Sequence, residues 1–259
     1  SSIVWGHHMY TTGMSPLLGK AFMFLTLLIS IPSSIFFLNW LGTMWRGNLH
    51  FETPMLFAMG VLWVFGLGGL TGLYNATVTS DIYLHDTMFV VGHFHYTMAA
   101  SVLFGGLAAI YFWFPKMFGK KMNPLLGKLH FWISFIPLNY VFFNMMVLGY
   151  AGQHRRLYDP NEYAFLAPIN DLNISITFFA VILGFSQLIF AYNFINSMIN
   201  GEKAEANPWK ANTLEWTLDG PIPHGNFATT PTVYNGPHEY SNPAVKDRDW
   251  IAQSEPMPT

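Results

Sequence analysis

The sequence has no cysteine and few charged residues. Asp, Glu, Lys and Arg make up only 10% of its 259 residues, against roughly 25% in an ordinary soluble domain. The absence of cysteine excludes disulfides, thiolate metal sites and CxxC redox motifs. The formal net charge of −2 gives no electrostatic basis for binding nucleic acid. This composition argues against a soluble enzyme and against a nucleic-acid-binding protein.

The few charges are unevenly distributed along the chain. Residues 1–200 hold 14 of the 26 charged side chains, and the last 59 residues hold the other 12. The segment 201–259 also contains 8 of the 16 prolines, which favours an extended, loop-rich segment with little core of its own. We therefore predict two parts, a transmembrane bundle over residues 1–200 and a polar extramembrane tail over residues 201–259.

Long apolar runs occupy the first 200 residues. A helix needs about 20 apolar residues to cross the hydrocarbon core of a bilayer. The five runs of this kind are 22–45, 55–74, 86–114, 129–152 and 172–198. The shorter run 1–14 cannot span and lacks the features of a signal peptide, so we interpret it as the end of a helix that starts upstream. The sequence thus predicts an all-α, polytopic transmembrane helix bundle.

Lysines and arginines predict the orientation of this bundle, because short cytoplasmic loops collect them. Lys116, Lys120, Lys121 and Lys128 lie between the third and fourth full spans, and Arg46 follows the first. We expect these loops and the tail on the cytoplasmic side. The loops expected on the opposite side are 15–20, 75–82 and 153–171.

Two adjacent arginines break this pattern. Arg155 and Arg156 lie in the loop 153–171, on the side opposite the lysines. An anionic ligand would explain why they are there. Pairing with the nearby Asp159 or Glu162 is the alternative, and spacing alone leaves both interpretations open.

Four ionisable side chains lie close together in the motif DIYLHDTMFVVGHFHY, residues 81–96: His85, Asp86, His93 and His95. Ionisable groups inside a membrane are costly and are by default functional. His93 and His95 are separated by about 200° around a helix, so they cannot share one metal as an i, i+4 pair does. Neutral imidazole commonly ligates haem iron, and haem fits between membrane helices. The spacing favours two haems, one on each side of the helix, and two structural core histidines are the alternative.

Two further pairs are candidate metal ligands. His85 and Asp86 are adjacent and suit a hard divalent ion such as Mg²⁺, or they pair with each other. His7 and His8 suit copper or zinc only where the helix ends or is distorted, because adjacent helical residues point about 100° apart. An interfacial histidine pair facing water is the alternative for His7 and His8.

Several motifs together resemble subunit I of the haem-copper cytochrome c oxidases. They are VWGHHMYTTGM (4–14), IPSSIFFLNWLGTMW (31–45), GGLTG (68–72), SDIYLHDTMFVVGHFHYTM (80–98) and HRRLYDP (154–160). The tail motif NPWKANTLEWTLDGPIPHGNF resembles the bacterial members of that family. The resemblance covers residues 1 to about 200. It implies the carboxyl-terminal half of a twelve-helix fold, from the end of the seventh helix through the twelfth.

The resemblance implies roles for the histidines. His7 and His8 would be two of the three ligands of the active-site copper, CuB. His93 would be the proximal ligand of the high-spin haem that faces this copper. His95 would be an axial ligand of the low-spin haem that delivers electrons. Both haems would be of the haem A type.

The resemblance also implies roles at the outer end of the bundle. His85 and Asp86 would lie at a Mg²⁺ site, and Arg155 and Arg156 would bind haem propionates. The implied activity is reduction of O₂ to water with electrons from cytochrome c, coupled to proton uptake and pumping, with quinol as the alternative donor. The implied partners are a CuA-bearing subunit II and a subunit III, in a bacterial plasma membrane. The family's other essential residues would lie upstream of this sequence, so we expect the chain alone to be catalytically incomplete.

One position departs from the family. The commonest oxidases have a lysine for proton uptake four residues after the proline of the motif 31–45, and this chain has Phe36 there. A phenylalanine cannot carry a proton, which places the usual second proton route in doubt. A nitric oxide reductase of the same superfamily therefore remains an alternative. A haem-free membrane transporter or structural subunit is the alternative from a different class.

Overall fold

The structure is a computed structural model that describes residues 2–236, 238–242 and 244–256. This part of the chain is almost entirely helical and contains two isolated β-bridges but no strand. Its helices, in chain order, are η1 Trp5–Met9, α1 Pro16–Leu28, α2 Ser30–Met44, α3 Thr53–Ala76, α4 Val78–Leu84, α5 Met88–Phe94, η2 His95–Ala100, α6 Ser101–Phe118, α7 Pro124–Tyr150, η3 Pro160–Glu162, η4 Ala164–Ile169, α8 Asn170–Asn200 and η5 Leu214–Thr217. Of the η segments, η2 is a π-helix and the others are 3₁₀-helices.

Five helical segments are long and apolar enough to cross a membrane. They are Pro16–Met44, Thr53–Ala76, Met88–Phe118, Pro124–Tyr150 and Ala164–Asn200. Each predicted apolar run overlaps one of them. The predicted all-α, polytopic architecture is confirmed.

The predicted loop 15–20 is wrong, because α1 begins at Pro16. Ser15 caps this helix by accepting a hydrogen bond from the Leu18 amide at 3.3 Å. Pro16 occupies the first helical position, where a missing N–H costs nothing. Ser15 and Pro16, which indicated a loop, instead mark the start of α1.

The predicted loop 75–82 is wrong as well, because most of it lies in α4. The Thr77 hydroxyl donates to the Leu73 carbonyl at 2.8 Å, and the Ser80 hydroxyl donates to the Tyr74 carbonyl at 2.6 Å. These side chains satisfy carbonyls at the end of α3 that have no helical partner. A second helix can therefore follow α3 directly.

The first span is divided near Ile29 into α1 and α2. Pro32 has no N–H for the carbonyl four residues earlier, and its ring disfavours a straight helix there. Ser30 donates to the Leu27 carbonyl at 2.6 Å, and Ser33 donates to the Ile29 carbonyl at 2.9 Å. The hydroxyl groups thus satisfy carbonyls next to the break inside an apolar span.

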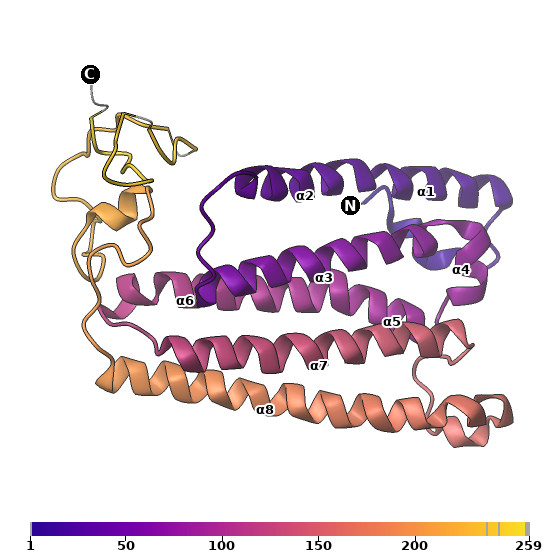
Figure 1. The fold of residues 1–259 in the computed structure, drawn as a ribbon. Helices are drawn as coiled ribbons and strands as arrows, with labels where there is room; N and C mark the ends of the chain where they lie inside the picture. The colour runs from indigo at the N-terminus through magenta and orange to yellow at the C-terminus, as the bar shows by residue number, and fades with distance from the viewer. Residues whose placement is uncertain (1, 237, 243, 257–259) are drawn as a thin grey trace. The chain divides into compact units, whose positions relative to one another are not determined.

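The chain forms two compact units. Unit 1 comprises Ser1–Ala108 and Lys128–Leu188, and unit 2 comprises Ala109–Gly127 and Ile189–Thr259. All eight predicted site residues belong to unit 1. Within unit 1, α3, α5 and α7 run lengthwise beside one another (Figure 1). The division of the chain at residue 200 stays a prediction.

Glycines bring α5 and α7 into backbone contact within unit 1. A Cβ atom on Gly92 of α5 would lie 2.6 Å from the Phe142 carbonyl oxygen of α7. A Cβ atom on Gly149 of α7 would overlap the backbone nitrogen of Phe89. Because neither glycine has a side chain, α7 lies directly against the helix that contains His93 and ends next to His95.

Unit 2 connects the tail to the end of α6. The Lys116 ammonium donates to the Leu218 carbonyl and lies 5.1 Å from the centre of the Trp216 ring. Lys121 pairs with Glu205 at 2.8 Å, and the hydrogen bond and positive charge of Lys121 lower the pKa of Glu205. The tail therefore supplies both backbone and side-chain partners to lysines near the end of α6.

The contact between α5 and α7 predicts a large effect for Gly149→Ala. The added methyl would meet backbone atoms of Phe89, which cannot rotate away, so we expect a loss of about 3 kcal/mol of stability. Gly184→Ala on α8 is the matched control, because a Cβ atom there meets nothing within 4 Å. Thermal unfolding of the purified protein in detergent should separate the two variants. Equal Tm values would contradict the backbone contact.

Candidate functional site

His93 is oriented by α3. Its Nδ1 lies 3.0 Å from the Gly68 carbonyl oxygen and 3.1 Å from the Thr71 hydroxyl. The Thr71 hydroxyl donates to the same carbonyl at 2.8 Å. A carbonyl can only accept, so Nδ1 carries the ring proton and Nε2 keeps the lone pair that can bind a metal. The His93 ring is therefore fixed in the tautomer of an Nε2 ligand.

The motif GGLTG allows this close approach of α3. A Cβ atom on Gly72 would lie 3.0 Å from His93 Cε1, and one on Gly68 would lie 2.9 Å from the Thr97 backbone nitrogen. Only a residue without a side chain leaves room for the imidazole and for the backbone behind it. Sequence reasoning used this motif as part of the family resemblance and missed its role in placing His93. The signal available was a pair of glycines four residues apart, on one helical face.

His95 has different neighbours. Its Nδ1 lies 2.8 Å from the Val91 carbonyl oxygen of its own helix, so the same argument leaves Nε2 with the lone pair. The ring centre lies 4.4 Å from that of Phe94 and 4.8 Å from that of Phe142 on α7. His93 and His95 thus present Nε2 in separate surroundings, one bordered by α3 and the other by α7.

The π-helix η2 starts at His95 and was not predicted. Its wider i→i+5 turn is rare and occurs frequently at functional sites. Hydroxyl groups support the carbonyls around it: Thr97 donates to the His93 carbonyl at 3.3 Å, and Ser101 donates to the Tyr96 carbonyl at 2.9 Å. The sequence signal was weak, consisting of two hydroxyl residues four positions apart in an apolar run.

His7 and His8 lie together in the 3₁₀-helix η1. Their ring centres are 4.0 Å apart with an interplanar angle of 49°. The Thr26 hydroxyl lies 3.4 Å from His7 Nδ1, and His7 interacts electrostatically with His8 and with His93. Adjacent residues of a 3₁₀-helix point about 120° apart, so the contact between the two rings, and not the tighter turn, is what brings the imidazoles together.

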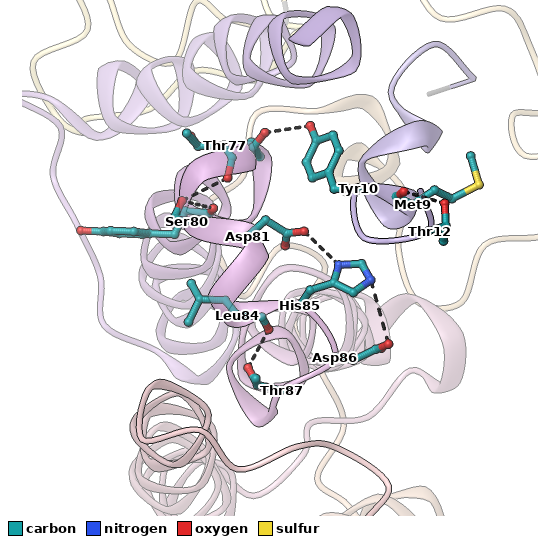
Figure 2. A network of polar contacts seen from close by, with 12 residues as sticks. Met9, Tyr10, Thr12, Thr77, Ser80, Asp81, Leu84, His85, Asp86 and Thr87 are labelled. Carbon is teal, nitrogen blue, oxygen red and sulfur yellow. Dashed lines mark hydrogen bonds and ion pairs between the residues drawn. The ribbon is translucent and has the colours of Figure 1, made fainter. Parts of the chain in front are cut away.

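His85 lies between two carboxylates (Figure 2). Its Nδ1 is 2.9 Å from Asp81 Oδ2, and its Nε2 is 3.9 Å from Asp86 Oδ2. Burial raises the pKa of Asp81, while the hydrogen bond and charge of His85 and the charge of His8 partly offset this effect. Sequence reasoning missed Asp81, although its i, i+4 spacing to His85 was a usable signal.

Arg155 pairs with Asp86. Its Nε and Nη2 atoms lie 2.7 Å and 2.5 Å from Asp86 Oδ1, and its backbone N–H donates to the Asp86 carbonyl at 2.9 Å. The suggested alternative partners, Asp159 and Glu162, form no ion pair with either arginine in the part of the chain that the structure describes. Arg156 adopts a left-handed backbone conformation with φ 65°.

The donor sets of these residues fit the predicted groups to different degrees. The two helix histidines offer one Nε2 each, as haem iron requires. The η1 histidines offer two imidazoles without thiolates, a set that suits copper. Among the described residues, no group of three or more His, Cys, Asp or Glu could hold a metal ion. A Mg²⁺ ion at His85 and Asp86 would therefore take most of its ligands from water or from other groups.

Comparisons with known proteins identify the family. The family model "Cytochrome C and Quinol oxidase polypeptide I" matches residues 1–182. The "Alternative cytochrome c oxidase subunit 1" of Bradyrhizobium diazoefficiens is 44% identical over 262 residues, covering 100% of this chain and 44% of that protein. The "Cytochrome c oxidase subunit 1" of Synechocystis sp. is 42% identical over 240 residues, covering 92% of this chain and 42% of that protein.

A solved structure supports the fold. A haem-copper terminal oxidase dimer, determined by cryo-electron microscopy, matches with a TM-score of 0.65 at 20% identity, covering 78% of this chain and 40% of that one. This chain spans less than half the length of the relatives and of the solved chain. The resemblance read from the sequence is confirmed, and the chain belongs to the cytochrome c and quinol oxidase polypeptide I family.

Proposed function

We propose that this chain is part of the catalytic subunit of a terminal respiratory oxidase. The enzyme reduces O₂ to water at a haem-copper centre with electrons from cytochrome c, coupled to proton uptake and pumping. The observation that carries the proposal is that His93 and His95 each have Nδ1 bonded to a carbonyl, which leaves Nε2 for a metal. The names of the relatives at 42–44% identity support the reaction.

The two helix histidines are the proposed haem ligands. His93 is the proximal ligand of the high-spin haem, and His95 is an axial ligand of the low-spin haem, both haems being of the A type. When bound, the haems supply iron that exchanges single electrons, with an open position on the high-spin iron for O₂. The chain's contribution is orientation, since outer hydrogen bonds fix the ring and raise the basicity of the ligating nitrogen.

His7 and His8 are the proposed ligands of CuB. Burial and the charges of His8 and His93 lower the pKa of His7, and this closeness of His7 to His93 supports a copper position near the high-spin haem. Neutral imidazoles would leave the positive charge of the metal uncompensated, which favours the arrival of electrons, and net charge at such a buried centre is costly. Proton uptake that accompanies each electron relieves this cost, and such coupling is what a pump can use.

Arg155 and Arg156 are the proposed partners of haem propionates. A guanidinium group can bind a carboxylate through two of its nitrogens, and Arg155 contacts the single oxygen Oδ1 of Asp86 through both Nε and Nη2. His85 and Asp86 are the proposed Mg²⁺ ligands. Because Arg155 contacts Asp86, the proposed propionate site and the proposed Mg²⁺ site lie next to each other.

The proposed location is the inner membrane of a bacterium, with the tail on the cytoplasmic side. The proposed partners are a CuA-bearing subunit II, a subunit III and cytochrome c, with quinol as the alternative donor. In α2, Phe36 is 60% exposed and the Ser33 hydroxyl is bonded to the Ile29 carbonyl. Proton uptake past this position would therefore depend on water or on another residue.

Separate alanine variants of the helix histidines test the proposal. In the whole oxidase, we expect His93→Ala to abolish the high-spin haem signal and His95→Ala to abolish the low-spin signal in a reduced-minus-oxidised spectrum. His224→Ala, an exposed tail variant, should change neither signal. Loss of both haems equally, or of neither, would count against two ligands on one helix. A wild-type complex without any haem band would favour a transporter or structural subunit.

Metal content separates the oxidase from a nitric oxide reductase. Elemental analysis of the wild-type complex should find copper in addition to haem iron, because His7 and His8 suit copper. His7→Ala and His8→Ala should each remove copper bound at the active site while the low-spin haem band remains. Non-haem iron without active-site copper in the wild-type complex would instead support the reductase.

The role of α3 predicts different effects for two neighbouring glycines. Gly72→Ala would place a methyl 3.0 Å from His93 Cε1 and displace the ring, whereas Gly69→Ala meets nothing within 4 Å. We expect Gly72→Ala to disturb the high-spin haem spectrum and lower turnover by about tenfold, the effect of disturbing the support of a metal ligand. Gly69→Ala should match the wild type. Identical spectra of the two variants would contradict the role of α3.

A further inference from the structure

Two aromatic side chains contact the ring of His95. Phe94 lies on one side, with an interplanar angle of 31°, and Phe142 of α7 contacts it at 36°. The hydrogen bond from Nδ1 to Val91 fixes the tautomer but comes from the same helix. The contact with Phe142 is therefore the one that ties the plane of the His95 ring to a neighbouring helix.

Tyr96, the residue after His95, joins the same face of α7. Its side chain is fully buried, and its hydroxyl lies 3.1 Å from the Asn139 carbonyl oxygen and 3.2 Å from Asn139 Oδ1. The Tyr96 ring contacts Phe142 edge-on at 5.8 Å. Asn139 and Phe142 are three residues apart and so lie on one face of α7. This face contacts His95 and Tyr96 together.

Asn139 is itself held from two directions. The Trp63 indole N–H of α3 donates to Asn139 Oδ1 at 2.9 Å, and Asn139 Nδ2 donates to the Phe135 carbonyl at 2.8 Å. The side-chain amide thus links α3, α7 and Tyr96. We call Tyr96, Asn139 and Trp63 the amide node.

The local backbone explains why His95 needs such support. η2 begins at His95, and a π-turn has poorer intrinsic stability than an α-turn, which is why it is rare and short. Gly68 of α3 has no side chain, and a Cβ there would lie 2.9 Å from Tyr96 Cβ. Tyr96 is therefore confined between α3 and α7 at the point where the regular helix ends.

We propose that Tyr96 and Asn139 are positioning residues for His95: their hydrogen bond holds α7 against the π-helix, and Phe142 transmits this position to the His95 ring. The inference rests on the proposed function, in which His95 binds the low-spin haem. His93 takes its direct side-chain support from α3 through Gly68 and Thr71. The two haem ligands are then adjusted by different helices, and a change at the node alters the low-spin haem selectively.

Tyr96→Phe in the whole oxidase tests the proposal, because it removes one hydroxyl and keeps the ring. We expect the low-spin haem band to shift or split, with the high-spin band and the haem content unchanged. Tyr140→Phe is the matched control: this tyrosine lies on α7, next to Asn139, but its hydroxyl bonds to Ser175 of α8 at 3.0 Å. It should leave both bands at their wild-type positions.

Trp63→Phe provides a second test, since it removes the other donor to Asn139 Oδ1. It should shift the low-spin band in the same direction as Tyr96→Phe. The proposal is overturned if Tyr96→Phe leaves the low-spin band unchanged or moves both bands alike. It is also overturned if Tyr96→Phe and Trp63→Phe both lose all haem while Tyr140→Phe keeps it, because the node would then be a general folding contact.

The single variant His95→Ala, made in the wild-type oxidase, separates this inference from the proposed function. If His95→Ala removes the low-spin band and Tyr96→Phe does not affect it, the amide node is refuted and the haem assignment stands. If His95→Ala retains the low-spin band, the haem assignment itself fails.

Discussion

The nitrogen that a histidine offers to a metal is decided by the partner of its other nitrogen. In this chain the partners are the Gly68 carbonyl for His93 and the Val91 carbonyl for His95. Both lie in apolar spans, where no bulk water competes for the carbonyl and a hydrogen bond is electrostatically stronger than in solution. The tautomers are thus set by the backbone, and the proposed ligation depends on helices that bring those carbonyls within reach.

The helix α3 can approach His93 because two of its residues, Gly68 and Gly72, have no side chain. The Gly68 carbonyl accepts from Thr71 and from His93, which is possible because a carbonyl oxygen has two lone pairs. The Thr71 bond stays within the helix, whereas the His93 bond requires another helix to come close. Gly68 and Gly72 remove the side chains that would prevent this. The small residues of α3 are therefore part of the ligand geometry as well as of helix packing.

Local features of the sequence predicted the five apolar helices correctly, and the roles of the candidate histidines stay predictions. Span length and charge depletion are properties of one segment, and each span satisfies its own backbone. The π-helix at His95 was not predictable in this way, because hydroxyl groups and contacts with α3 support it.

Ion pairs between residues far apart in the sequence could not be predicted either, because they also depend on contacts between distant segments. The pairing of Asp86 with Arg155 joins residues 69 positions apart. It follows from the β-bridge between Thr87 and His154, which aligns two loops. The alternative partners that the sequence suggests, Asp159 and Glu162, are acidic residues close to the arginines along the chain. Proximity along the chain was a poor guide here, since the backbone pairing places Asp86 closer than either.

The lysines that predicted orientation have a second use within unit 2. Lys116 is 4% exposed, and its ammonium is satisfied by the Leu218 carbonyl and the face of Trp216. Lys120 donates to the Met198 and Ile199 carbonyls at 2.9 and 2.7 Å, near the end of α8, where a cation suits both the unpaired carbonyls and the helix dipole. A lysine whose charge served only to orient the chain in the membrane would need no partner within the chain. These two have partners in the last turn of α8 and in the tail, so their charge contributes to packing as well as to the expected orientation, and the two effects cannot be changed independently at these positions.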